Sequence, residues 1–127
     1  MKKAISLREK LCKRANVFTH NAYKVVKLLP KEELFGVGSQ LKRASVSVSC
    51  NIIEGFARDG WSRSKKDLLR FLEIGYGSLE ESKYLIRFSH EEYHLDKNKV
   101  KKALEAGDKI GKLLFSFIKQ LRENNKY

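Results

Sequence analysis

The sequence predicts an all-α protein, a single domain over residues 1–127 that forms an up-down-up-down antiparallel four-helix bundle. One proline and eight glycines in 127 residues favour a few long elements over many short strands. Apolar residues recur at steps of three or four through four separate segments. Short connections join these segments, and short connections make successive helices antiparallel neighbours.

The first predicted helix covers residues 5–29. Its apolar positions, spaced by three or four, are Leu7, Leu11, Ala15, Phe18, Ala22, Val25 and Leu29. Pro30 disfavours a helical conformation at Leu29, and it suits the first turn of a new helix because Glu32 and Glu33 follow it. We therefore expect a turn near Leu29.

The second segment is ambiguous because residues 45–53 alternate small polar and β-branched side chains, as a half-buried strand would. Helical spacing nevertheless continues through this alternation, at Leu34, Val37, Leu41, Ala44, Val48, Ile52 and Gly55. The chain also offers no second strand-like run for pairing. We predict a helix, followed by Gly60 as a left-handed C′ residue.

The third and fourth helices have start signals of their own. Ser64 and Asp67 have the spacing of a capping box, and Asp96 is a candidate N-cap. The expected core positions of the third helix are Leu68, Phe71, Leu72, Gly75, Leu79, Ser82, Leu85 and Ile86. Those of the fourth are Val100, Ala103, Leu104, Gly107, Ile110, Leu114, Phe117, Ile118 and Leu121.

The third helix carries more apolar surface than one stripe needs. Ile74, Tyr76, Tyr84 and Phe88 fall outside the expected core face. Two interpretations stay open, since these side chains either lie partly exposed on a monomer or form a subunit interface around Tyr76, Tyr84 and Phe88.

Charge is the strongest compositional signal. The chain has 27 Lys and Arg against 15 Asp and Glu, and a net charge of +12 attracts polyanions such as nucleic acid or anionic membrane. No apolar run approaches the ~20 residues of a membrane span, and the N-terminus lacks a signal-peptide apolar stretch. We expect a cytoplasmic protein that binds no membrane.

Cys12 and Cys50 lack CxxC spacing, which predicts two reduced, largely buried thiols.

The bundle topology gathers the positive charge at one end, which we call the basic end. The start of the first helix, the turn between the second and third, and the close of the fourth meet there. Its cations are Lys2, Lys3, Arg8, Lys10, Arg58, Arg63, Lys65, Lys66, Arg70, Lys119, Arg122 and Lys126, against Glu9, Asp59, Asp67 and Glu123. Trp61 lies in the same turn, where its indole could stack on an unpaired base. We predict nucleic-acid contacts for Lys2, Lys3, Arg58, Trp61, Arg63, Lys65, Lys66, Arg70 and Arg122.

Catalytic signatures are absent or incomplete. His90-Glu91-Glu92-Tyr93-His94 matches the H-E-x-x-H zinc pattern, but no histidine follows His94 as a third ligand. The chain has no phosphate loop after Gly36 and no G-x-S-x-G elbow. We expect no enzyme, metal or cofactor.

Polar residues within the second helix have two possible roles. Asn51 falls on the inward stripe, flanked by Arg43, Glu54 and Arg58, and Glu54 can pair with Arg58 four residues later. A buried polar network explains this arrangement without a function. The alternative is that Arg43 or Asn51 contacts a ligand.

The combined pattern resembles a known family. It comprises LPKEELFGVGSQLKRASVSV from Leu29, NIIEGF from Asn51, SKKD from Ser64 and FLEIGYGSLEE from Phe71. It resembles the four-helix bundle proteins encoded in intervening sequences of bacterial 23S rRNA genes, which are in turn similar to the accessory variability determinant (Avd) of diversity-generating retroelements. The match covers about residues 4 to 121.

This resemblance implies a bundle assembled as a ring-shaped homopentamer. In the retroelement relatives it implies a basic surface that engages RNA and a reverse transcriptase, but it supplies no defined activity. Our leading hypothesis is a non-catalytic bundle that binds nucleic acid, RNA above all, through its basic end. The alternative is a protein-interaction module, such as a reverse-transcriptase accessory partner, without direct RNA readout.

Overall fold

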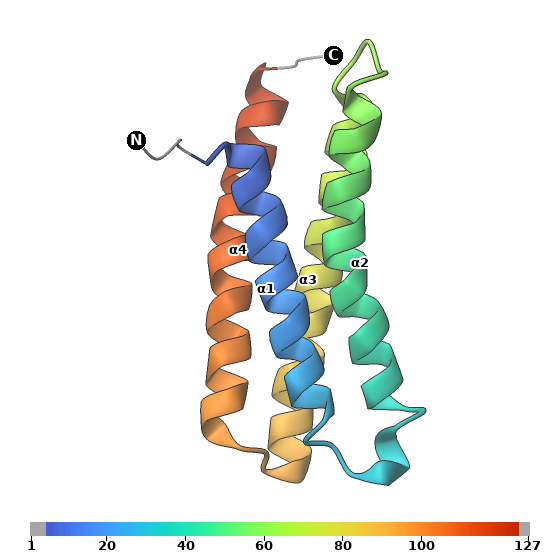
Figure 1. Cartoon of the computed structure of the whole chain (residues 1–127), viewed down its shortest axis with the longest axis vertical. Helices are drawn as coiled ribbons and strands as arrows, with labels where there is room; N and C mark the ends of the chain where they lie inside the picture. The colour runs from blue at the N-terminus through green and yellow to red at the C-terminus, as the bar shows by residue number, and fades with distance from the viewer. Residues whose placement is uncertain (1–4, 125–127) are drawn as a thin grey trace.

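The computed structural model describes residues 5–124, which form four long helices and one short 3-10 turn (Figure 1). The elements are α1 (Leu7–Val26), η1 (Lys31–Glu33), α2 (Val37–Asp59), α3 (Lys66–Tyr93) and α4 (Lys97–Asn124). No strand occurs within residues 5–124. The helices alternate in direction, so the start of α1, the α2–α3 turn and the close of α4 lie at one end (top in Figure 1). The predicted four-helix bundle is confirmed, whereas the pentamer stays a prediction.

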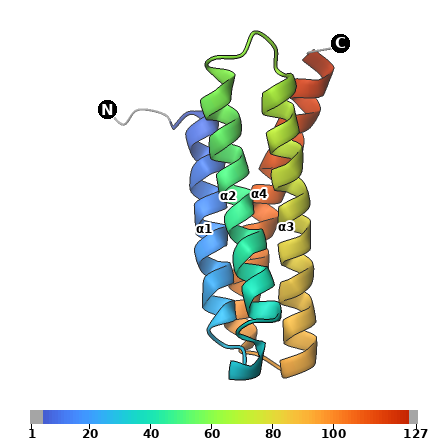
Figure 2. The same ribbon diagram turned by 90° about the vertical axis from the view of Figure 1, so that its right-hand side faces the viewer.

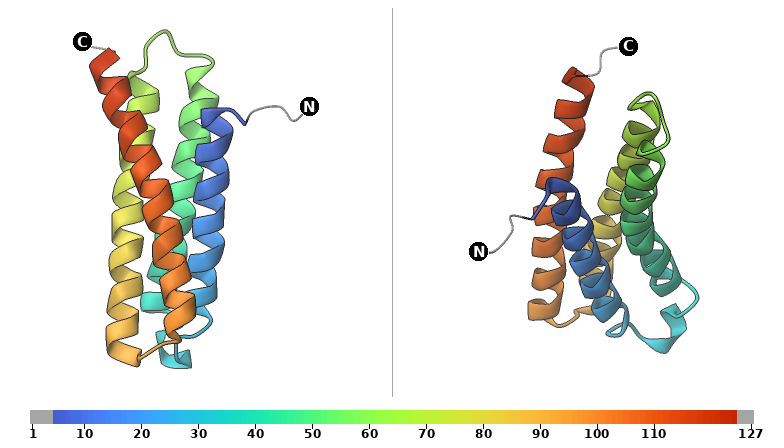
Figure 3. Two further views of the ribbon diagram at one scale, coloured as in Figure 1. Left: turned by 90° about the vertical axis from the view of Figure 1, so that its left-hand side faces the viewer. Right: turned by 45° about the horizontal axis from the view of Figure 1, so that its top comes forward.

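Two views from opposite sides show which helices are neighbours. Figure 2 looks onto α2 and α3, which pack along their length. The left view of Figure 3 looks onto α4, with α1 beside it. The molecule therefore has an α2–α3 flank and an opposite α1–α4 flank.

Residues 45–53 lie within α2, which settles the ambiguity between strand and helix. The alternating serines satisfy their hydroxyls within helical geometry. Ser45 Oγ donates to the Lys42 carbonyl at 3.1 Å, Ser47 Oγ bonds Ser78 Oγ of α3 at 2.9 Å, and Ser49 Oγ bonds Thr19 Oγ1 of α1 at 2.8 Å. Ser47 and Ser49 are therefore contacts between helices, whereas the hydroxyl of Ser45 bonds within α2.

The helix boundaries confirm some start signals and correct others. Asp96 Oδ1 accepts from the Lys99 amide at 3.1 Å, as predicted for an N-cap. Gly60 has a φ of −64°, so it is right-handed rather than left-handed. Ser64 Oγ accepts from the Lys66 amide at 3.4 Å and not from Asp67. The capping box does not form because the N-cap of α3 is Lys65 rather than Ser64, which makes Asp67 the second helical residue instead of the third.

The core follows the predicted stripes closely. Phe18, Leu41, Leu72 and Ile110 have no exposed surface, and they come one from each helix. Two stripe positions at the edges are exceptions, since Leu7 is 41% exposed and Leu34 is 51% exposed outside α2.

The cysteine prediction is wrong in part. Cys50 is exposed because it lies on the outer side of α2, whereas Cys12 is half-buried. Burial raises the pKa of the Cys12 thiol, and the charge of Arg8 opposes that shift.

Candidate nucleic-acid interface

The α2–α3 turn presents the predicted aromatic side chain to solvent. Trp61 is 93% exposed, and Arg63, Lys65 and Lys66 are exposed beside it. The turn is held by backbone bonds, since the amides of Trp61 and Ser62 both donate to the Arg58 carbonyl at 3.0 and 3.2 Å. The predicted contacts Lys2 and Lys3 lie outside the described residues.

Ion pairs neutralise part of the basic end. Of its twelve cations, nine belong to the described residues, and at least three of these pair with carboxylates. The pairs are Lys65 with Asp59 at 2.7 Å, Arg58 with Glu54 at 2.9 Å, and Arg122 with Glu73. Two of these acids, Glu54 and Glu73, lie outside the sequence-level definition of this end. The available positive charge is therefore smaller than the sequence count implies.

Two arginines of this end rest on an aromatic ring. The guanidinium carbons of Arg58 and Arg70 lie 4.9 and 5.1 Å from the centroid of Phe71. Phe71 itself is buried, so its ring fixes both arginines against the bundle. This leaves Arg63 and Trp61 as the most freely presented side chains of the turn.

A second cationic surface lies on the α1–α4 flank and was not anticipated from the sequence. A groove of about 650 Å³, which we call the α1–α4 groove, runs between the two helices. Among residues 5–124, the cations that line it are Lys10, Lys13, Arg14, Lys24, Lys99, Lys102 and Lys109, and the one acid is Glu105. Only Lys10 was counted in the basic end.

The surplus apolar side chains of α3 form two aromatic pairs, one of them with Phe115 of α4, and the charged Glu80 and Arg87 are exposed on the same helix between Tyr76 and Phe88. Tyr84 is 60% exposed and stacks on Phe88 at a centroid distance of 6.2 Å, while Tyr76 is half-buried against Phe115 at 5.9 Å. Ile74 is exposed too, and a Cβ at Gly77 would meet no atom within 4 Å. We call this surface, formed by Ile74, Tyr76, Gly77, Tyr84, Phe88 and Phe115, the α3 apolar face.

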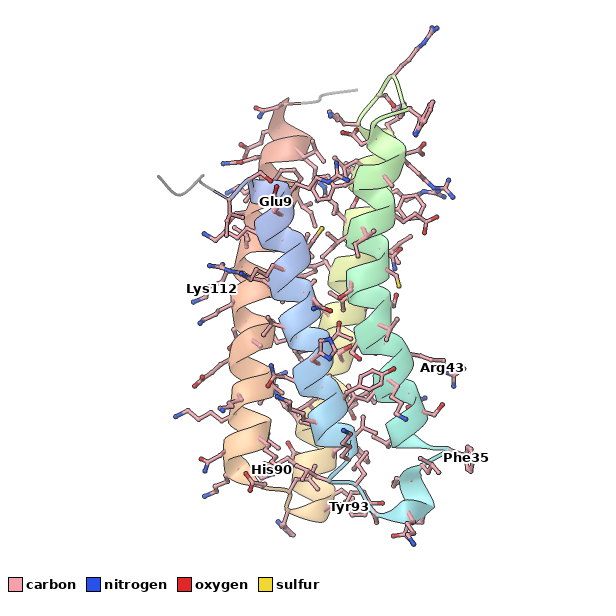
Figure 4. The ribbon with its side chains drawn as sticks, in the orientation of Figure 1. Glu9, Phe35, Arg43, His90, Tyr93 and Lys112 are labelled. Atoms are coloured by element: carbon pink, nitrogen blue, oxygen red, sulfur yellow. The ribbon has the colours of Figure 1, made fainter. Side chains whose placement is uncertain are left out.

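The polar residues of α2 form a structural network. Asn51 Nδ2 donates to the carbonyl and to Oγ of Ser47 at 2.8 and 2.9 Å, and Ser47 Oγ in turn bonds Ser78 Oγ. Gly75 of α3 lies against this network, since a Cβ there would be in ordinary van der Waals contact with the Cβ of Asn51 at 3.5 Å. Arg43 takes no part, and its side chain points away from the bundle (Figure 4).

The H-E-x-x-H match is interrupted by the end of α3. The helix stops at Tyr93, and His94 adopts a left-handed conformation with a φ of 49°. His90 Nδ1 is buried and has no hydrogen-bond partner among residues 5–124. Within the same range, no group of three or more His, Cys, Asp or Glu side chains is arranged to hold a metal ion.

The end of the bundle opposite the basic end contains a hydrogen bond between segments distant in sequence. Tyr93 Oη donates to Glu33 Oε2 at 2.6 Å and ties the close of α3 to η1 (Figure 4). This hydrogen bond raises the pKa of Tyr93 to about 12, because the nearby carboxylate disfavours a phenolate.

The structure resembles one solved by crystallography. It is a protein of unknown function from the S23 ribosomal protein family of Bacteroides thetaiotaomicron VPI-5482, with 21% identity and a TM-score of 0.76. The match covers 90% of this chain and 99% of that one, and it shows a shared fold. No curated protein matches. Among the described helices, none has the length and apolar character to cross a membrane.

The family model of the 23S rRNA-intervening sequence protein matches residues 8–116, which includes nearly all of the four helices. The relation to the accessory variability determinant stays a prediction, since neither match names it. The chain belongs to the 23S rRNA-intervening sequence protein family.

Proposed function

We propose that this protein is a non-catalytic bundle that binds RNA through its basic end in the cytoplasm. The observation that carries the proposal is Trp61, whose indole is 93% exposed among exposed cations. A tryptophan left in water forfeits the free energy that burial of so large an apolar side chain would supply. A base stacked on the indole would recover part of it, while Arg63 and its neighbours bind phosphates.

The ionisable groups with shifted pKa values support a role without catalysis. Burial raises the pKa of Cys12 in α1, and the Glu33 hydrogen bond raises that of Tyr93 at the far end of α3. Burial lowers the pKa of Lys83. The carboxylates of Asp108 and Glu80 have the larger, opposite effect, so the pKa of Lys83 lies above its usual value. Each shift has its own structural cause on a different part of the bundle. An active site would bring such groups together in one cleft.

Self-association through the α3 apolar face belongs to the same proposal. A second copy would cover the exposed Tyr84 and Phe88 together with the half-buried Tyr76. Five copies in a ring would multiply the charge of the basic end into one field that attracts RNA over a longer range. The self-association is thus expected to strengthen RNA binding.

The second candidate function is a protein-interaction module, such as an accessory partner of a reverse transcriptase. Phe35 favours it, because this side chain is 91% exposed and lies beside the exposed Leu34 in the connection before α2 (Figure 4). Exposed apolar residues in a loop are typical of protein contacts. This candidate differs from the first in requiring no RNA.

The test measures binding of a labelled RNA of about 16 nucleotides, the upper end of common site sizes, to the full chain. The basic-end variant Arg63→Gln/Lys65→Gln/Lys66→Gln is compared with a control, Lys27→Gln/Lys31→Gln/Lys97→Gln, that removes the same charge elsewhere. We expect the basic-end variant to lose affinity and to lower the salt slope by about 2, roughly 0.7 per lost phosphate contact on a single strand. A wild-type protein that binds no RNA at low salt would overturn the proposal and favour a protein partner.

A further inference from the structure

We propose that the α1–α4 groove holds the sugar–phosphate backbone of a single RNA strand, independently of base sequence. The inference rests on the proposed RNA binding, but it concerns a surface distinct from the α2–α3 turn. Four of the groove cations come from α1 and three from α4, so they stand on both walls. A polyanion in the groove would meet positive charge on both sides.

The positive charge of the groove is uncompensated. None of its seven cations makes an ion pair with any residue between 5 and 124. The single groove acid, Glu105, lies 3.9 Å from Lys101, which is not a groove residue. At the basic end, by contrast, Arg58, Lys65 and Arg122 already have carboxylate partners. The groove therefore offers cations without carboxylate partners among residues 5–124, and bound phosphates would release their condensed counterions there.

The close spacing of the two helices favours a single strand over a duplex. Adjacent helices in a bundle lie about 8–10 Å apart, so the space between their outer side chains is narrower than a nucleic-acid duplex. A duplex would touch only the rims, whereas one strand can enter a groove of about 650 Å³. From Lys10 to Lys24, α1 advances by about 21 Å at 1.5 Å per residue, which is long enough for several nucleotides.

The lining favours backbone contacts over base reading. The apolar part of the groove consists of Ile5, Val17 and Ala106, and none of the residues from 5 to 124 that line it is aromatic. Bases thus find no ring on which to stack, unlike at Trp61. The one amide side chain in the groove, Asn21, already donates to the Val17 carbonyl at 2.9 Å. Lysine and arginine contacts to phosphate remain, and such contacts carry no sequence information.

The position of Lys10 links the groove to the basic end. This residue lines the groove and also lies near the start of α1, where the basic end begins. α1 and α4 are antiparallel, so Lys99 and Lys24 lie toward the opposite end (Figure 3). A strand in the groove would follow the length of the bundle and leave it beside the cations of the basic end.

The experiment compares three variants of the full chain that remove equal charge. The groove variant is Lys13→Gln/Lys102→Gln/Lys109→Gln, and the other two are the basic-end variant and the Lys27/Lys31/Lys97 control. The probes are oligouridylate, oligoadenylate and an RNA duplex of the same length. We expect the groove variant to bind both single strands about tenfold or more weakly, with a salt slope lower by about 2, and the control to change little. Duplex affinity should differ much less between the groove variant and the control.

The outcomes separate the inference from the proposed function. Wild-type binding that the basic-end variant loses and the groove variant keeps would overturn the inference alone. Loss in the groove variant only would uphold it and overturn the basic-end site. A duplex bound as tightly as a single strand, with equal dependence on the groove lysines, would contradict single-strand selection. A polyglutamate peptide that displaces the RNA at equal charge concentration would identify an acidic-protein site and overturn the inference. Unchanged melting temperatures exclude misfolding, since all substituted lysines are exposed.

Discussion

The α1–α4 flank and the α3 apolar face expose opposite chemistry on one small bundle. Between α1 and α4, seven cations line a groove that has one carboxylate. On the outer side of α3, Tyr84 stacks on Phe88 and Gly77 leaves open space. Like charges repel a second copy from the first surface, whereas apolar area attracts one to the second.

This difference teaches how one fold can present two surfaces that suit different kinds of partner. The core stripes of all four helices are satisfied within one copy, so both surfaces are additions to the fold rather than requirements of it. In a ring each copy uses two different surfaces, so the α1–α4 groove stays open to RNA only if the surface that meets the α3 apolar face lies elsewhere on the bundle. The predictions below test whether the two surfaces are independent.

The largest expected effect is on assembly. Tyr84→Glu combined with Phe88→Glu places two charges in the α3 apolar face and should convert the oligomer to monomers, because burying unpaired carboxylates is costly. The measurement is molar mass by light scattering at micromolar concentration. Phe35→Glu serves as the control, since it adds a charge at another exposed aromatic residue. A wild-type protein that is itself monomeric would show that the face is ordinary exposed surface.

The next effect is on the turn of the basic end. Trp61→Ala should weaken the binding of single-stranded RNA by about 1–3 kcal/mol if a base stacks on the indole. The melting temperature should not change, because a side chain that is 93% exposed contributes little to folding. Anisotropy titrations with oligouridylate and a duplex measure the effect. An equal loss for both RNAs would rule out stacking at this residue.

Substitution of a packed glycine and of an exposed glycine should change stability in opposite directions. Gly107→Ala should destabilise the fold by about 1–3 kcal/mol, because its Cβ would lie 3.0 Å from Phe18 and 3.2 Å from the stem of Lys83. Gly77→Ala, tested in the Tyr84→Glu/Phe88→Glu background, should stabilise the monomer by about 0.5–1 kcal/mol. Urea unfolding measures both. Equal shifts for the two glycines would refute the difference in packing.

The smallest effect lies at the end opposite the RNA-binding turn. Tyr93 should ionise near pH 12, later than an ordinary tyrosine, because the Glu33 carboxylate holds its phenol neutral. The stability that this bond supplies is present below about pH 10 and is lost as the pH rises through 12, since the raised pKa belongs to the folded state. Ultraviolet titration of tyrosinate should show a late step that Tyr93→Phe removes. A late step that persists in the variant would assign it to another residue.

Periodicity predicted the fold well because a long helix repeats its core position many times. Leu72, Leu79 and Ile86 lie on the predicted stripe of α3, and all three are fully buried. Helix boundaries were less predictable, since Gly60 and Ser64 depend on how the turn closes rather than on their own preferences. Both of these wrong predictions concern the connection between α2 and α3.

The sequence predicted which candidate-site residues lie at the same end of the bundle, but not which of them lie on the same side. Chain direction indicates which cations share an end, and Trp61 and Arg63 lie exposed as expected. The α1–α4 groove depends instead on the angle of each side chain around its helix and on which helices are neighbours. Lys10, Arg14 and Lys24 could have been grouped on α1 by helical spacing, but Lys102 and Lys109 join them only through packing. Partners such as Glu73 for Arg122 are likewise unreachable from spacing alone.

Lysine acetylation footprinting of the wild-type protein with bound oligouridylate tests most directly whether RNA and self-association use separate surfaces. We expect protection of the groove lysines Lys13, Lys102 and Lys109, and of Lys66 at the basic end, with Lys27, Lys31 and Lys97 modified as in the free protein. The same pattern should hold in the monomeric Tyr84→Glu/Phe88→Glu variant. Uniform protection of all lysines, or protection that vanishes with the oligomer, would contradict the separation of the two surfaces.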